Sequence, residues 1–124
     1  MTKLILAIAI IESSLNPNAV GDGGKAVGIM QIHPCVITDV NYFCKSNYKN
    51  SDRRDTEKSF EICQKYLTYW GSVYEERTAL KCTAEVYAKI WNGGPFGWKK
   101  EGAVKERLDR YWFKVQQELN RLQK

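Results

Sequence analysis

The residue whose type and position best suit chemistry is Glu12, at the end of an apolar segment. Residues 4–11 are leucine, isoleucine and alanine throughout, and a glycine-rich run follows at 21–24. Burial against apolar groups disfavours the charged carboxylate and keeps a carboxylic acid protonated near neutral pH. Such an acid can donate its proton to the leaving oxygen of a glycosidic bond. On position alone, a solvated glutamate at a helix end is the more ordinary interpretation.

Four stretches of the chain form a pattern around this glutamate. They are 12–19 (ESSLNPNA), 24–34 (GKAVGIMQIHP), 91–95 (WNGGP) and 111–115 (YWFKV). In composition and order they closely resemble the lytic transglycosylase domain of the lysozyme-like superfamily. With the apolar segment they span residues 4–115, nearly the whole chain. One such stretch would be weak evidence, whereas four in the family's order are specific.

The resemblance implies a role for individual residues. It implies that Glu12 is the catalytic acid and base, and that Gln31 is a hydrogen-bonding residue on the floor of the cleft. Trp91 and Asn92 are implied to contact sugars beside the acid. His33 stands where the family often has another residue, and we expect it to line the same cleft.

Each of the binding residues also has an ordinary structural interpretation. Gln31 could satisfy a buried backbone group, and Trp91 could belong to the core, as an aromatic residue at helical spacing commonly does. Tyr87 lies one turn before Trp91 and is a further candidate sugar contact, although core packing is the more ordinary role. Tyr111 suits packing better than catalysis.

A second carboxylate, Asp22, bears on the product of the reaction. The Asn-Gly-Gly sequence at 92–94 and the Gly-Asp pair at 21–22 resemble goose-type lysozyme, in which a loop aspartate helps to position an attacking water. Asp22 could do the same, although a turn-forming aspartate is the more ordinary interpretation. Trp91 also departs from the family's usual tyrosine.

Two reactions therefore remain open at the same bond, the β-1,4 bond between N-acetylmuramic acid and N-acetylglucosamine. In a lytic transglycosylase the 6-hydroxyl of muramic acid attacks, and the product has a 1,6-anhydro end. A lysozyme needs a positioned water, usually through a second carboxylate. With one strong carboxylate, the sequence favours the transglycosylase over a goose-type muramidase. A catalytically silent glycan-binding module is a third possibility, but such a module would be expected to lack the acid.

Composition limits the partners. The 124 residues carry a net charge of +5, which favours polyanionic partners such as a bacterial wall. Acidic residues interleave with the basic ones in the last predicted helix, which argues against nucleic acid. No apolar run approaches the roughly 20 residues of a membrane-spanning helix, so we expect no stable membrane insertion. We expect a monomer that binds peptidoglycan glycan strands and uses no cofactor.

The cysteines, the single histidine and the N-terminal segment lead to three further expectations. There are four cysteines, none in a Cys-x-x-Cys pair, and a single histidine, so we expect no metal site. An enzyme acting at the bacterial wall, whether periplasmic, extracellular or phage-released, works outside the reducing cytosol, so we expect at least one disulfide. Residues 1–11 imitate a signal peptide but lack a small-residue cleavage site, so we interpret them as the first helix of the domain.

The elements that must position these residues are mostly helical. Apolar spacing and breakers predict helices at 3–15, 35–44, 56–69, 76–91 and 102–122, with loops at 18–28 and 45–55. Expected core positions include Leu15 on the first helix and Leu80 on the fourth. We predict a mainly α, compact lysozyme-like helical domain with an active-site cleft, formed by residues 1–124 as a single domain.

Overall fold

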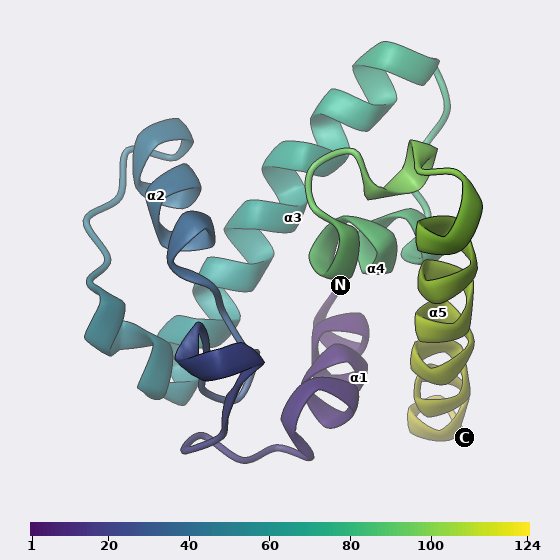
Figure 1. Cartoon of the computed structure of the whole chain (residues 1–124). Helices are drawn as coiled ribbons and strands as arrows, with labels where there is room; N and C mark the ends of the chain where they lie inside the picture. Colours follow the sequence, from purple (N-terminus) through teal and green to yellow (C-terminus); the bar gives the residue numbers. More distant parts are fainter. The chain divides into compact units, whose positions relative to one another are not determined.

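Five α-helices make up most of the computed structural model, which describes residues 1–124 (Figure 1). They are α1 (Thr2–Ser13), α2 (Pro34–Phe43), α3 (Thr56–Thr78), α4 (Ala84–Gly93) and α5 (Gly102–Leu122). The prediction of a mainly α fold is confirmed. The chain divides into two compact units, residues 1–66 and 67–124, and the division falls within α3. No helix is long and apolar enough to cross a membrane.

Helix α1 is buried over its middle, as its apolar sequence predicts. Its buried residues are Leu4, Ile5, Ala7, Ile8 and Ala9. The helix ends at Ser13, because Ser14 and Leu15 both adopt left-handed backbone conformations, with φ of 55° and 64°. The predicted end at residue 15 was therefore wrong. Leu15 is 44% exposed and does not belong to the core.

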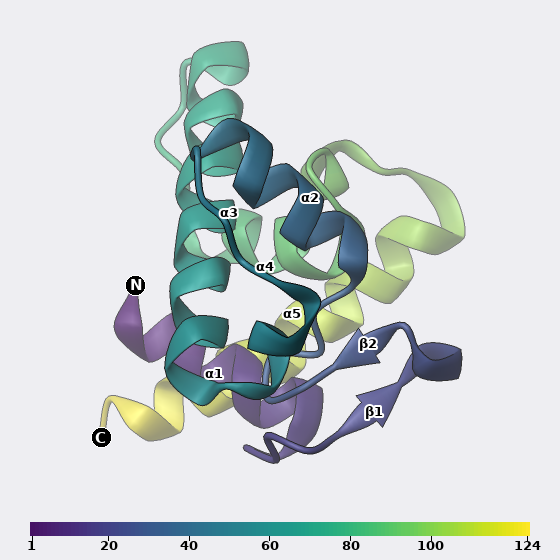
Figure 2. The ribbon, with the colours of Figure 1, turned by 90° about the vertical axis from the view of Figure 1, so that its left-hand side faces the viewer.

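A small β-hairpin occupies the segment for which a loop was predicted. Strands β1 (Val20–Gly21) and β2 (Ala26–Val27) pair antiparallel (Figure 2). The 3₁₀ helix η1 (Asp22–Gly24) joins them, and all three of its residues have positive φ. Strands of two residues are too short to show the alternation by which a strand is recognised in sequence.

The boundary between the third and fourth helices also differs from the prediction. Helix α3 continues to Thr78, and α4 begins at Ala84 rather than at residue 76. Gly71 does not break α3: it is buried, and a Cβ there would lie 2.5 Å from the Tyr87 ring of α4. Glycine at this position therefore allows close approach of the Tyr87 side chain. Leu80 lies between the helices and is 61% exposed, so its expected core position was wrong.

Within the second unit, α4 and α5 pack closely. A Cβ at Gly93 would lie 2.8 Å from the Leu108 side chain, so the glycine permits the contact between the helices. Lys89 of α4 is only 9% exposed and pairs with Glu85 and with Asp109 of α5, each at 2.7 Å. The bounds predicted for the last helix, 102–122, are confirmed.

The expected disulfide is not present, since all four cysteines are free. Cys35 and Cys44 lie at opposite ends of α2. A separation of nine helical residues is roughly 13 Å, beyond the roughly 7 Å that a disulfide tolerates between Cα atoms. Cys63 is fully buried in α3. The expectation rested on the compartment in which the enzyme works, and compartment alone does not bring two thiols together.

Candidate active site

Glu12 is the second-last residue of α1 and is half-buried. Its carboxyl group lies within electrostatic reach of Cys63, which α3 holds at 0% exposure. Burial raises the pKa of the Cys63 thiol well above its ordinary value, and the negative charge of Glu12 raises it further. The glutamate thus stands at the edge of the apolar interior of the first unit. This is the setting in which a carboxylic acid can serve as a proton donor.

Ser13 fixes the end of the helix that carries Glu12. Its hydroxyl donates to the Ile29 carbonyl at 2.7 Å, and it accepts a hydrogen bond from the Asn16 backbone N–H at 3.1 Å. The bond to Ile29 ties the end of α1 to the segment after β2, and the bond from Asn16 fixes the turn that follows the helix. Sequence reasoning gave Ser13 no role, although its place directly after the candidate acid, at the end of the helix, was a usable signal.

Gln31 organises the hairpin through its side-chain amide. The amide nitrogen donates to the carbonyls of Ala19 at 3.1 Å and Gly28 at 3.0 Å. Two carbonyl acceptors require the NH₂ group here, which fixes the orientation of the amide. A Cβ at Gly21 would lie 2.6 Å from the side-chain oxygen of Gln31, so the glycine makes room for it. With its donors engaged by the backbone, Gln31 can offer a ligand only an acceptor.

Asp22 and His33 are brought together by the hairpin. The His33 Nε2 and Asp22 Oδ2 atoms are 3.1 Å apart, and the side chains are 38% and 67% exposed. His33 is the residue at which the chain enters α2, directly before Pro34. A polar contact this exposed contributes about 0–1 kcal/mol to stability. The pair is better understood as setting the direction of the Asp22 carboxylate.

Arg53 holds the segment between Lys25 and Ile32, a role that the sequence did not indicate. It belongs to the 3₁₀ helix η2 (Asn50–Arg54), and its guanidinium donates to the carbonyls of Lys25 at 3.0 Å and Ile32 at 2.9 Å. The Arg53 carbonyl lies so close to Gly28 that an added Cβ would be 1.8 Å from it. The basic pair at 53–54 offered no sequence signal for such a contact.

The other predicted site residues lie on α4. The Tyr87 ring packs on Gly71, and burial raises the pKa of its hydroxyl. Trp91 is half-buried, one turn further along the helix. The Asn92 side-chain oxygen accepts a hydrogen bond from the Arg107 guanidinium of α5 at 3.0 Å. Asn92 is thus held in place, and its amide nitrogen is the polar group left to meet a ligand.

The predicted residues therefore fall into two groups. Glu12, Asp22, Gln31 and His33 belong to the first unit, and Tyr87, Trp91 and Asn92 to the second. Within the first unit, Ser13, Gln31 and Arg53 form a continuous set of bonds around the segment that follows the acid. The convergence of the two groups on one cleft stays a prediction.

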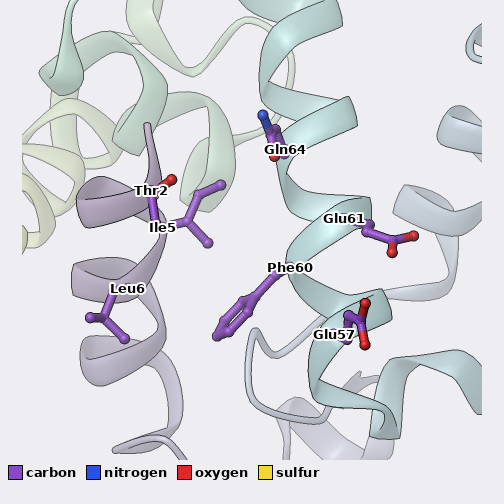
Figure 3. Close-up of a pocket in the computed structure, with 7 residues that line it drawn as sticks. All are labelled: Thr2, Ile5, Leu6, Glu57, Phe60, Glu61 and Gln64. Carbon is purple, nitrogen blue, oxygen red and sulfur yellow. The ribbon is translucent and has the colours of Figure 1, made fainter.

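A cavity of about 420 Å³ in the first unit contains none of these residues. It is lined by Thr2, Ile5, Leu6, Glu57, Phe60, Glu61 and Gln64. Figure 3 shows Phe60 reaching from α3 toward Ile5 and Leu6 of α1, while Glu61 points away from α1. The lining of this cavity is mostly apolar, and Glu12 does not contribute to it.

No group of three or more His, Cys, Asp or Glu side chains lies close enough together to hold a metal ion. The chemical groups around the candidate site are thus a half-buried carboxyl, a histidine–aspartate pair, and backbone and side-chain amides.

Comparison with known proteins identifies the family of the chain. The Transglycosylase SLT domain family matches residues 1–112. Comparisons with curated proteins and with solved structures gave no match. The matched range covers the first unit and most of the second, and it includes each candidate residue, from Glu12 in the first to Asn92 in the second. The chain therefore belongs to the SLT transglycosylase domain family of the lysozyme-like superfamily, whose members are enzymes that cleave peptidoglycan.

Proposed function

We propose that the chain cleaves the β-1,4 bond between N-acetylmuramic acid and N-acetylglucosamine, with Glu12 as the general acid. The observation that carries the proposal is the position of half-buried Glu12 at the end of the apolar helix α1, within electrostatic reach of the fully buried Cys63. The Glu12 carboxyl protonates the glycosidic oxygen as the bond to the muramic C1 breaks. The resulting carboxylate then takes the proton of the muramic 6-hydroxyl, whose oxygen attacks C1. The acid is regenerated, no water is consumed, and the product carries a 1,6-anhydro end.

The remaining candidates bind the strand in this proposal. Gln31 accepts a hydrogen bond from the sugar through its side-chain oxygen, because its amide protons are already donated to Ala19 and Gly28. Trp91 supplies an aromatic face for the same strand, and Asn92 its amide nitrogen. His33 also contacts the sugar. Tyr87 is the weakest of these candidates, since its ring already packs on Gly71.

The goose-type lysozyme reaction is the alternative, and Asp22 decides between the two. A hydrolase would need this carboxylate to position water near the sugar. Asp22 is instead mostly exposed, and its carboxylate is engaged by His33 at 3.1 Å. This engagement favours the transglycosylase.

The test is the Glu12→Gln variant on purified peptidoglycan. The amide has the shape of the acid but cannot donate its proton, so we expect the rate to fall by at least roughly a hundredfold. Glu57→Gln is the matched control, because Glu57 is an exposed acid on α3 that lines the separate cavity. Near-wild-type lysis by folded Glu12→Gln would refute the assignment. Mass spectrometry of wild-type products distinguishes the two reactions, since anhydro and reducing ends differ by one water.

A further inference from the structure

The second unit carries a chain of aromatic rings in addition to the candidate sugar contacts. The rings of Tyr69 and Trp70 on α3 are 4.9 Å apart, and Trp70 lies 5.9 Å from Phe96. Phe96 lies 6.4 Å from Trp98, which lies 5.0 Å from Tyr74. All four contacts are edge-to-face, the geometry that stabilises aromatic pairs. We call these five residues the aromatic cluster.

Two cations lie over this cluster. The Arg77 guanidinium is 4.8 Å from the centroid of Phe96, and the Lys99 ammonium is 5.8 Å from Phe96 and 5.9 Å from Trp98. Both residues are exposed, and neither forms an ion pair with a carboxylate. The neighbouring Glu75 instead accepts a hydrogen bond from the Cys82 backbone N–H at 2.8 Å. The cluster therefore holds two positive charges with which no carboxylate forms an ion pair.

The segment that presents Phe96 and Lys99 is held by glycines. Gly94 has φ of 92°, which turns the chain at the end of α4. A Cβ at Gly97 would lie 2.1 Å from the Lys89 carbonyl, so only glycine allows this close packing on α4. The segment directly follows Trp91 and Asn92 in the chain. A cation held on an aromatic ring loses less side-chain freedom on meeting an anion than a free surface lysine does.

We propose that Arg77 and Lys99, on the aromatic cluster, form an exosite that binds the carboxylates of peptidoglycan stem peptides. This inference rests on the proposed function, because it assumes the same polymer as substrate. Stem peptides present carboxylates at regular intervals along the glycan, which complements both the cation pair and the net charge of +5. The apolar parts of a stem peptide can lie against the rings. The exosite keeps the enzyme on the polymer and takes no part in bond cleavage.

The experiment measures co-sedimentation with intact sacculi in the Glu12→Gln background, where strands are bound but not cut. We expect the Arg77→Gln/Lys99→Gln double variant to bind roughly five- to tenfold more weakly, since each exposed contact contributes up to about a factor of five. Lys114→Gln/Lys124→Gln is the matched control: it removes the same charge from exposed positions without ion pairs and should change binding less than about twofold.

A second substrate separates the stem peptides from other anions. On glycan strands freed of stem peptides by an amidase, the double variant and its parent should bind equally. Three results would overturn the exosite. The first is that the Arg77→Gln/Lys99→Gln variant loses as much binding on these stem-free strands as on sacculi. The second is that both double variants bind sacculi equally well, and the third is that the binding difference disappears once wall phosphate polymers are removed from the sacculi. Failure of the parent protein to bind sacculi at all would instead refute the proposed function.

Discussion

The position of the Asp22 carboxylate depends both on the backbone conformation of Asp22 and on its contact with His33. The φ of Asp22 is 52°, a left-handed conformation that aspartate tolerates better than most residues other than glycine. The hairpin turn imposes this conformation, and the His33 imidazole meets the carboxylate. The sequence offered a turn-forming role for Asp22 as the alternative to a catalytic one, and the structure shows the turn. A catalytic role would have to be additional.

Asp22→Asn tests that additional role. Asparagine tolerates the left-handed conformation equally well, so the turn should persist. If the muramic hydroxyl is the nucleophile, activity should stay within about threefold of wild type, because Glu12 still carries both proton transfers. Turnover and product ends would be measured together. A loss of roughly a hundredfold, with reducing ends in the wild-type products, would overturn the transglycosylase in favour of the lysozyme reaction.

Elements with a long, regular apolar pattern could be predicted from the sequence, and those fixed by contacts between distant residues could not. The run at 4–11 identified α1, and Leu108 and Val115 marked the buried side of α5. In contrast, a glycine such as Gly71 is typical of a helix end, but Gly71 lies inside α3 and makes room for the Tyr87 ring of α4. For the site, Glu12 could be found because four stretches of the chain follow the order of a known family, whereas its position after an apolar run did not single it out. The bonds from Gln31 depend on a hairpin too short to leave a pattern.

At the scale of elements, the hairpin segment depends on Gly28. Its φ is 87°, and an added Cβ would lie 1.8 Å from the Arg53 carbonyl of η2. Gly28→Ala therefore combines left-handed strain with a clash against backbone, and should lower the free energy of unfolding by about 3 kcal/mol or more. Gly23→Ala is the matched control: its φ is 65°, but no atom lies within 4 Å of the new Cβ.

Urea unfolding of the two variants checks this prediction. Gly23→Ala should cost only about 1–2 kcal/mol, the strain of the left-handed conformation alone. Gly28→Ala should unfold at a much lower urea concentration, or fail to accumulate as folded protein while Gly23→Ala accumulates. Equal stability of the two variants would show that η2 moves freely and does not fix the hairpin.

For the whole molecule, we propose that both units act as one monomeric domain at the bacterial wall. Helix α3 is continuous through the division between Tyr66 and Leu67, so neither unit can unfold fully without disrupting a helix that the other uses.

All four tryptophans, residues 70, 91, 98 and 112, lie in the second unit. Tryptophan fluorescence therefore follows the second unit alone, whereas far-ultraviolet circular dichroism follows all the helices.

This distribution of tryptophans allows a test of cooperativity with a substitution in the first unit. Ser59 is fully buried, and its hydroxyl donates to the Arg53 carbonyl at 2.9 Å. Ser59→Ala should lower the free energy of unfolding by about 1–3 kcal/mol, while Ser51→Ala, at an exposed position of η2, should have little effect. In a single cooperative domain the urea midpoint from tryptophan fluorescence should fall with Ser59→Ala by as much as the midpoint from circular dichroism. A fluorescence midpoint that stays at its wild-type value while circular dichroism shows an earlier transition would mean that the units unfold independently, and the single-domain proposal would be wrong.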